Sequence, residues 1–402
     1  MKTAYIYDSV RTPRGKGKPS GALYQVKPVD LLKDTLQAIQ LRNHLDTSEV
    51  SDAIIGCVSP VGGQGYNIAK SALLYANWSH QTSGIQINRF CTSGLEAVNL
   101  AATKIAMGYE ELIVAGGVES MSRVPLRSDG GALINDPEVI NSVRYLPQGV
   151  AADLIASLNG YSREQLDAFA LQSHEKASQA QAKGYFDASM IPVKDQNGLV
   201  ILDQDEHIRP ETDLEQLSQL TPSFQFAGEL GYETMSLQVY PQLKQLNYVH
   251  TAGNASGTVD GAALMLIGSA EIGQRFDWTP RAKITSYAIA STDPTIMLTG
   301  TIPATQKVLE RAGMEVKDID LWECNEAFAA VVFAFQSAFD IDFDRINVNG
   351  GAIAMGHPLG ATGTILLGTL LDELERRDLK TGLVAMCAGG GMGVATIIER
   401  IM

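Results

Sequence analysis

The sequence is poor in cysteine and histidine. Its four cysteines, Cys57, Cys91, Cys324 and Cys387, are widely spaced without a Cys-x-x-Cys pair, and its six histidines do not cluster. Neither a disulfide scaffold nor a zinc site fits this distribution. So few cysteines in a chain of 402 residues suit a reducing compartment. We therefore expect no bound metal ion and no disulfide framework.

Long hydrophobic runs are also missing. The chain has no stretch of 18 apolar residues, so we expect no membrane partner. The first residues, MKTAYIYDSVRTP, lack the apolar core of a secretion signal, and the last ones, IIERIM, are not a peroxisomal signal. The cytoplasm is the default expectation.

Positive charge is scarce. The 31 basic residues against 45 acidic ones give a formal net charge of −14, which disfavours nucleic acid as a partner. A phosphate-bearing substrate would need a local basic patch. The cationic stretch RTPRGKGK, residues 11–18, is one candidate, although we interpret it first as a solvated loop. With 45% hydrophobic residues, the chain can form one large core or two fused ones of about 150 residues each.

One cysteine lies where a helix is predicted to begin. A strand-like run at 85–88 leads into Cys91, and a helical spacing of apolar residues follows it (Leu95, Val98, Ala102, Ile105). Unpaired amides and the positive end of a helix dipole favour a thiolate over a thiol. The pattern therefore predicts a nucleophile, and the alternative is an inert buried cysteine.

The order of elements predicts an α/β fold. Strands and helices alternate up to a glycine pair at 116–117, where we expect a strand to end; the expected elements are strands 4–7, 53–58, 85–88 and 111–115 and helices 29–41 and 66–75. Residues 345–349, 362–376 and 382–387 repeat the succession of strand, helix and strand. We infer two similar layered α-β-α halves, with one active site between equivalent strand and helix ends.

Between the halves the pattern changes. Polar, glutamine-rich helical segments alternate with loops, which predicts an inserted loop domain that carries substrate contacts. We divide the chain into an N-terminal α/β half (1–121), the loop domain (122–249), a return to the N-terminal half (250–275) and a C-terminal α/β half (276–402).

The C-terminal half supplies further chemistry. His357 lies in the glycine-dense stretch GGAIAMGHPLGATG and can take a proton from a thiol, unless it is a capping or core histidine. Cys387 opens CAGGGMG, where a thiol can move a proton and bare amides can bind an oxyanion. A dinucleotide-binding loop is the weaker alternative, because the strand-like VATII follows the glycines instead of a helix.

At this point the sequence resembles the thiolases, which cleave 3-ketoacyl-CoA with CoA or condense two acyl-CoA molecules. Six motifs run in the family's order: CTSGLEAVNLAA, VAGGVESMSRVP, TAGNASGTVDGAAL, NEAFAA, GGAIAMGHPLGATG and CAGGGMG. They extend across almost the whole chain. Together they are far more specific than any one of them alone.

The resemblance implies the catalytic roles. Cys91 is the acylated nucleophile, His357 activates it, and Cys387 is the acid or base for the incoming thiol or the acetyl methyl group. Asn325 would hold a water that, with His357, stabilises the enolate oxygen. The amides of Cys91 and Gly389 would form the second oxyanion hole, at the thioester carbonyl.

The resemblance also implies CoA contacts. Ser256 matches a position that contacts the pantetheine arm, and Met355 is expected to contact CoA. The Arg-Pro-x-Phe element of the family reads Thr-Pro-Ser-Phe at 221–224, so Arg209 or the loop 11–18 must hold the CoA phosphates. CoA and acyl-CoA thioesters are substrates, no cofactor is bound permanently, and a homodimer or homotetramer is implied.

A departure from the family pattern bears on the acyl chain. Short-chain acetoacetyl-CoA thiolases carry a His-Met pair where this chain has Pro147 and Gln148. This favours a degradative 3-ketoacyl-CoA thiolase over a biosynthetic acetoacetyl-CoA thiolase. A ketoacyl synthase lacks a counterpart of Cys387, and a catalytically silent acyl-CoA-binding protein would not need the four catalytic side chains. We assign packing roles to Cys57 and Cys324.

The remaining histidines form no predicted site. His250 precedes the TAGN motif and is either a CoA contact or a turn residue. His44, His80, His174 and His207 show no constellation in the sequence, and we assign them no role.

Overall fold

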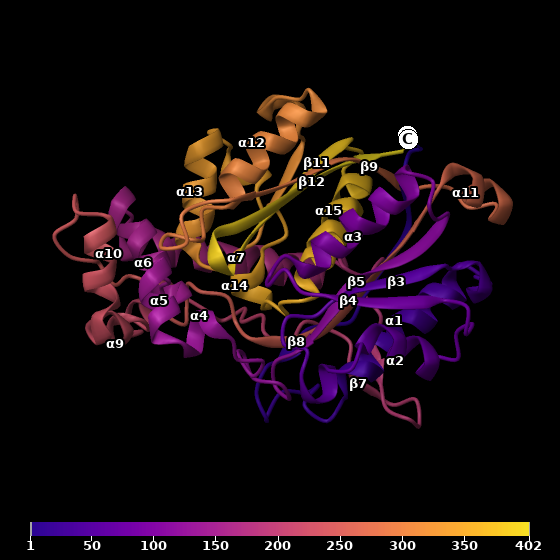
Figure 1. Cartoon of the computed structure of the whole chain (residues 1–402), viewed down its shortest axis with the longest axis horizontal. Helices are drawn as coiled ribbons and strands as arrows, with labels where there is room; N and C mark the ends of the chain where they lie inside the picture. The colour runs from indigo at the N-terminus through magenta and orange to yellow at the C-terminus, as the bar shows by residue number, and fades with distance from the viewer. Residues whose placement is uncertain (1, 402) are drawn as a thin grey trace.

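A mixed β-sheet forms the centre of the molecule. The structure, a computed structural model, describes residues 2–401. Within them the sheet has ten strands in the order β10-β11-β12-β9-β1-β8-β5-β3-β4, with β2 paired to β8. The strands are β1 (Tyr5–Arg11), β2 (Gly15–Lys16), β3 (Asp52–Gly56), β4 (Ser83–Ile87), β5 (Leu112–Ser120), β8 (Val259–Gly268), β9 (Ala282–Ser291), β10 (Leu321–Cys324), β11 (Thr381–Ala388) and β12 (Met392–Arg400). The predicted α/β class is confirmed (Figure 1).

The sheet consists of two halves that are joined over a short distance. Strand β1 pairs with β8 along its whole length, but it meets β9 only at Tyr5 opposite Lys283 and Ile6 opposite Ala282. Strands β1, β3, β4, β5 and β8 form the N-terminal half, and β9 to β12 form the C-terminal half. Helix α11 (Ala270–Phe276) carries the chain from one half to the other.

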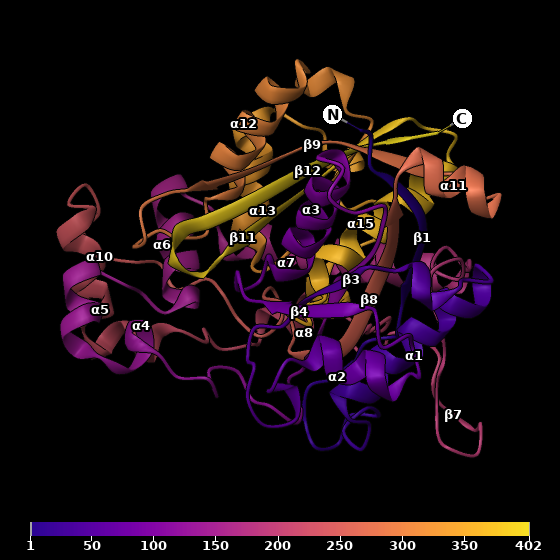
Figure 2. The same cartoon turned by 45° about the vertical axis from the view of Figure 1, so that its right-hand side comes forward.

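Two helices lie between these halves, α3 (Ser93–Ala106) and α15 (Thr362–Arg376) (Figure 2). The apolar positions predicted for α3, among them Leu95 and Val98, pack into one core with side chains from both halves of the sheet. Residues 362–374 of α15 are all buried, because sheet covers the helix on both sides. Since Cys91 precedes α3 and His357 precedes α15, this middle layer positions both.

Helices also cover the two outer faces. Helices α1 (Pro28–Arg42) and α2 (Ile68–Tyr75) cover the N-terminal half, and α12 (Thr301–Ala312) and α13 (Ala329–Phe339) cover the C-terminal half. In β3, Ala53 and Ile55 face the outer helices whereas Ile54 faces the middle layer, as the alternation of a strand requires. No helix among residues 2–401 combines the length and the apolar character needed to cross a membrane.

Most elements of the segment between β5 and β8 are helices. In Figure 1 several of its helices stand apart at the left of the molecule, while α7 runs beneath the C-terminal half. Its elements are α4 (Ala132–Asn135), α5 (Pro137–Val143), α6 (Gln148–Asn159), α7 (Arg163–Ala182), β6 (Val193–Lys194), β7 (Val200–Leu202), α8 (Leu214–Ser218), α9 (Gln225–Ala227) and α10 (Glu233–Val239). The division of the chain at 121, 249 and 275 remains a prediction.

One expected strand end differs from the structure. Strand β5 does not stop at Gly116 and Gly117 but continues through them to Ser120. A Cβ at Gly116 would lie 2.0 Å from the carbonyl oxygen of Ala263, and one at Gly117 would lie 1.8 Å from that of Gly360. These glycines allow backbones to approach closely and do not form a turn.

Residues 345–349 do not form the expected strand. They pair with the sheet through a single bridge between Ile346 and Trp322. The side chain of Asn347 supplies hydrogen bonds that a paired strand would otherwise make. It accepts from the amide of Cys324 at 2.9 Å and donates to the carbonyl of Cys324 at 2.8 Å. The short α14 (Ala352–Met355) follows and leads into the His357 turn.

Candidate active site

Cys91 lies in a tight turn between β4 and α3. Phe90 adopts a left-handed backbone (φ 46°), and its amide donates to Asn88 Oδ1 at 2.8 Å. Ser93 Oγ accepts from the Arg89 amide and donates to the Phe90 carbonyl. The sequence thus supplies the hydrogen bonds that hold the strained turn, and Cys91 is 7% exposed.

The expected net lowering of the Cys91 pKa at the start of a helix is wrong for this closed site. Burial raises the pKa of the thiol to about 11, with a smaller contribution from the Glu119 carboxylate. Hydrogen bonds from the Gln148 side chain and from the amides of Cys91 and Gly389 act in the opposite direction. Burial outweighs them, because it removes the solvation of the thiolate. At neutral pH Cys91 therefore rests as a thiol.

His357 is held in one tautomer. Its Nδ1 lies 2.6 Å from Thr362 Oγ1, and that hydroxyl donates to the Pro358 carbonyl at 2.9 Å. The hydroxyl therefore accepts from His357, so we place the proton on Nδ1. Asn325 Nδ2 lies 3.3 Å from the free Nε2. Burial, assisted by the nearby Arg14 cation, lowers the pKa of His357 to about 3, so the ring is a neutral base at physiological pH.

The C-terminal half brings a second thiol to the same place. Cys387 lies near the end of β11, and the amide of Gly389 just beyond it reaches the Cys91 sulfur. Burial raises the pKa of Cys387, and proximity to Cys91 raises it further. Two neutral thiols from different halves thus lie within electrostatic reach of each other. In such a pair, one thiol can attack carbon while the other transfers a proton.

Asn325 and Glu326 follow β10 and hold the neighbouring loop. Asn325 Oδ1 is buried without a partner among residues 2–401, so it is free to accept a hydrogen bond. Glu326 accepts from Ser173 at 2.7 Å, from Asn347 at 3.0 Å and from the Ile353 amide at 3.1 Å. Glu326 therefore fixes the glycine-rich loop that carries the histidine. Sequence reasoning did not select it, although it lies in the NEAF motif.

Glu119 is a second buried carboxylate that sequence reasoning missed. Its Oε2 accepts from the amides of Val58 and Gly360 at 2.9 and 3.0 Å. Its Oε1 accepts from the Ser59 amide at 3.2 Å and from Gln64 Nε2 at 2.8 Å. Glu119 thus joins a loop of the N-terminal half to the loop that follows the histidine.

A cavity of about 280 Å³ opens at the Cys91 sulfur. Its walls include Gly389, Tyr145 and Gln148 near the sulfur, and the segment 126–134 farther out. Most of the remaining wall is apolar, with Phe90 and Leu359 among its side chains. An apolar cavity with a few polar groups beside the reactive atom is typical of an organic substrate site.

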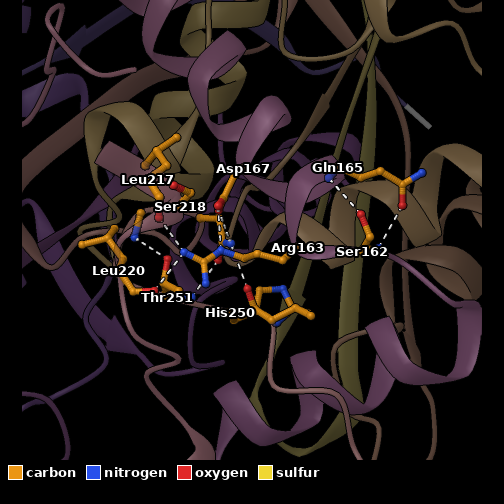
Figure 3. Close-up of polar contacts among 12 residues, drawn as sticks. Ser162, Arg163, Gln165, Asp167, Leu217, Ser218, Leu220, His250 and Thr251 are labelled. Carbon is orange, nitrogen blue, oxygen red and sulfur yellow. Dashed lines mark hydrogen bonds and ion pairs between the residues drawn. The ribbon is translucent and has the colours of Figure 1, made fainter. Parts of the chain in front are cut away.

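The segment that carries Ser256 is anchored on the inserted helices. Figure 3 shows Arg163 between Asp167 and the carbonyls of Leu217 and Leu220, at 2.6, 2.5 and 3.0 Å. Asp167 also accepts from Asn254 Nδ2 at 2.8 Å, two residues before Ser256. The Ser256 amide in turn donates to the Ala327 carbonyl of the NEAF motif at 3.0 Å.

His250 is a structural residue of this segment. Its ring is fully buried, with Nδ1 2.7 Å from Asp153 and Nε2 3.4 Å from the Ala330 amide. The alternative that it is part of a turn and not a CoA contact fits this position. Cys57, directly after β3, and Cys324, in β10, are both buried, as expected for packing residues.

The cationic stretch 11–18 is not a solvated loop. Arg11 is 2% exposed and forms a bidentate ion pair with Asp205 at 2.9 and 3.0 Å, and Arg14 is buried beside it. Burial lowers the pKa of Arg14 to about 10. Only Lys16 and Lys18 remain accessible. The interpretation failed because the partner of Arg11 is supplied by a distant part of the chain.

Arg209 belongs to a group of cations around His207. Arg209 is exposed, and together with Lys16 and Lys18 it surrounds His207, whose pKa burial and these cations lower to about 4. The His207 ring packs on Gly257, whose carbonyl accepts from the His357 amide at 2.9 Å.

Met355 is 2% exposed in an apolar cluster with Phe186, so its placement does not support the expected CoA contact.

Comparison with known proteins identifies the family. The family profile "Thiolase, N-terminal domain" matches residues 4–271, and "Thiolase, C-terminal domain" matches residues 278–400. The chain belongs to the thiolase family. A thiolase of Aeromonas hydrophila named 3-ketoacyl-CoA thiolase is 39% identical over 410 residues, covering all of both chains. A thiolase of Escherichia coli named 3-oxoadipyl-CoA/3-oxo-5,6-dehydrosuberyl-CoA thiolase is 38% identical, again over both whole chains.

A solved thiolase shares the fold. The crystal structure of the Bacillus anthracis acetyl-CoA acetyltransferase superimposes with a TM-score of 0.86 at 34% identity, covering all of this chain and 99% of the other. Family membership and the predicted thiolase fold, with its acyltransferase activity on CoA thioesters, are therefore confirmed.

Proposed function

We propose that this thiolase degrades 3-ketoacyl-CoA thioesters longer than acetoacetyl-CoA, releasing acetyl-CoA. The proposal is carried by two pairs of groups: the Cys91 and Cys387 thiols lie within electrostatic reach of each other, and Asn325 Nδ2 lies 3.3 Å from the unprotonated Nε2 of His357. Leu359, two residues after His357, packs in one apolar cluster with Cys91. The resemblance to the thiolases implies a role for each of these groups. The resting protonation states derived above support these roles.

In the first half-reaction the Cys91 sulfur attacks the 3-keto carbon. Its proton passes to Nε2 of His357, which is a neutral base because burial lowers its pKa. The bond between C2 and C3 breaks and acetyl-CoA leaves as an enolate. His357 and a water on Asn325 stabilise the enolate oxygen, and Cys387, which burial keeps protonated, donates its proton to C2.

In the second half-reaction CoA takes the acyl group. The Cys387 thiolate accepts the proton of the CoA thiol, and the CoA sulfur attacks the acyl thioester on Cys91. The amides of Cys91 and Gly389 stabilise the tetrahedral intermediate, and each such donor contributes about 3 kcal/mol. Cys91 leaves as a thiolate and recovers its proton from His357, which closes the proton balance.

The cavity at Cys91 supports an acyl chain longer than acetoacetyl. A cavity of about 150 Å³ holds benzene. The 280 Å³ beside Cys91 therefore accommodate more than six carbon atoms. The competing function is that of a biosynthetic acetoacetyl-CoA thiolase, which the name of the Bacillus anthracis relative represents. The presence of Pro147 and Gln148 at the position of the His-Met pair favours the degradative function.

We further propose where CoA is held. Ser256 contacts the pantetheine arm, and the accessible cations Lys16, Lys18 and Arg209 bind the CoA phosphates. Their mutual proximity around His207, next to Gly257, supports this assignment. It supplies the local basic patch that an acidic protein needs for a phosphate-bearing substrate. CoA is a substrate here, and no permanently bound cofactor takes part.

Assembly and location complete the proposal. The protein forms a homodimer or a homotetramer and acts in the cytoplasm. Strand β4 supports an assembly, because it is the last strand of the sheet and Ile85 on it is exposed. Light scattering coupled to size-exclusion chromatography tests the assembly, and a monomeric mass would contradict it.

The decisive experiment is thiolysis of 3-ketoacyl-CoA thioesters of increasing chain length, followed by the loss of enolate absorbance. We expect kcat/KM to rise from acetoacetyl-CoA to longer chains. A maximum at acetoacetyl-CoA would instead assign the biosynthetic function. The series includes one chain that ends in a carboxylate, because Arg127 lines the cavity and the Escherichia coli relative is named for such substrates.

A further inference from the structure

The first residue of α6 reaches the reactive sulfur. Gln148 opens this helix behind Pro147, whose side chain provides no cap. Gln148 lines the same cavity as Cys91 and Gly389. As a hydrogen-bond donor beside Cys91, its side chain lowers the pKa of the thiol. The inserted segment therefore contributes a polar group to a site otherwise built by the two α/β halves.

The position of this amide is set by the glycine opposite it. A Cβ on Gly389 would lie 3.7 Å from Gln148 Nε2 and 3.3 Å from Tyr145 Oη. The NH₂ group of Gln148 thus lies over Gly389, beside the backbone amide that also reaches the Cys91 sulfur. A side-chain donor and a backbone donor thus lie together in the cavity that Cys91 lines.

We propose that Gln148 is a catalytic residue of this thiolase, whose side-chain amide donates a hydrogen bond to Sγ of Cys91 and stabilises the thiolate. The inference rests on the proposed role of Cys91 as the nucleophile. An amide suits this position because it donates without carrying charge. A methionine, which acetoacetyl-CoA thiolases have at the corresponding place, cannot donate to sulfur.

The charges around the sulfur explain why such a donor matters. Glu119 on β5 and Cys387 on β11 both interact unfavourably with a Cys91 thiolate, and so does a Tyr145 phenolate. The favourable groups are neutral donors: two backbone amides and Gln148. Of the three, only Gln148 can be removed by substitution.

The test is the pH dependence of Cys91 alkylation in the intact enzyme. Iodoacetamide is the probe, and peptide mass spectrometry follows Cys91 separately from the other cysteines. For Gln148→Met we expect the inflection to rise by about one pH unit, equivalent to a tenfold smaller thiolate fraction below it. Gln148→Glu preserves the shape but places a carboxylate beside the sulfur, so its inflection should rise further.

Matched variants and activity separate this role from packing. Gln172→Met replaces an exposed glutamine on α7 and should leave the alkylation profile unchanged. The kcat/KM for thiolysis should fall at least tenfold in Gln148→Met. The pH profile of kcat/KM should shift to higher pH by as much as the inflection of Cys91 alkylation does. Where Gln148→Met fails to fold, the isosteric Gln148→Glu decides.

Two outcomes would overturn the inference. An unchanged inflection in Gln148→Met would remove the hydrogen bond from catalysis, and an inflection in Gln148→Glu at or below the wild-type value would contradict a donor to the sulfur. Both differ from a failure of the proposed function itself. In that case Cys91 of the wild-type enzyme would not be alkylated in preference to the other cysteines.

Discussion

Replacing Glu119 with glutamine tests how the two catalytic loops are joined. This carboxylate accepts from four N–H groups, two on each oxygen, and Oε1 also accepts from the Cys57 thiol at 3.9 Å, so it acts purely as an acceptor. Glutamine has the same shape but turns one oxygen into an NH₂ group. Whichever oxygen is replaced, two buried N–H donors lose their acceptor.

The expected loss of stability follows from this count. Each buried donor left unpaired costs about 1–3 kcal/mol, so Glu119→Gln should lower the free energy of unfolding by about 2–6 kcal/mol. An unfolding entropy of about 2.1 cal/mol/K per residue over 402 residues gives about 0.84 kcal/mol/K. A loss of 4 kcal/mol then corresponds to a fall in Tm of about 5 °C.

The same substitution should make Cys91 more acidic. The Glu119 carboxylate raises the pKa of the Cys91 thiol, so its removal moves the inflection of Cys91 alkylation to lower pH. In Glu119→Gln we therefore expect a lower Tm together with a more reactive Cys91 sulfur. Glu111→Gln, an exposed carboxylate just before β5, is the control and should change neither. An unchanged Tm in Glu119→Gln would refute the reasoning.

Three further predictions concern the proton path and pH. Cys387→Ala should still acylate at Cys91 from acetyl-CoA, seen by mass spectrometry, but should lose at least about 100-fold in condensation, because the proton-transfer group is missing. Thr362→Val removes the acceptor that fixes Nδ1 of His357 and should lower kcat about 10–100-fold with little change in KM. His174 is buried with its pKa lowered to about 4 mainly by burial. Since the unfolded state binds its proton below about pH 6.5, stability is lost as the pH falls. His174→Gln should therefore reduce the loss between pH 7 and pH 5 by about 2 kcal/mol, measured by unfolding at both values.

Each of these has a control and a contradicting result. Normal condensation by Cys387→Ala would end its assignment, and Cys324→Ala controls for loss of a buried thiol. Thr369→Val, on the same helix, should keep wild-type kcat, and equal losses in both threonine variants would point to packing alone. For the histidine, exposed His80→Gln is the control, and an unchanged pH dependence in His174→Gln would show that burial of His174 does not contribute.

The parts of the fold that were predicted correctly are those whose signals are local. Helix α15 has the predicted bounds because its apolar period starts after a glycine-rich turn and ends in charged residues. The strand before Cys91 and the helix after it follow from adjacent alternation and helical spacing. These signals need no knowledge of what lies opposite in space.

The errors arose where a distant partner decides. The glycines in β5 are required by Ala263 and Gly360, more than 140 residues away in sequence. Arg11 is buried because Asp205 pairs with it across 194 positions. The helix end near Cys91 was visible in the sequence, but the burial that reverses its effect on the pKa comes from both halves and from the inserted segment.

The layer of α3 and α15 has a consequence for producing the enzyme in pieces. The boundary between the two family profiles, near residue 275, invites the construction of two separate genes. Because α15 is covered by sheet on both sides, the isolated second fragment would expose to water a face that the first normally shields. Such fragments would aggregate when expressed singly. A split enzyme is therefore to be sought only by co-expression, with recovered activity reporting that the two fragments have reunited.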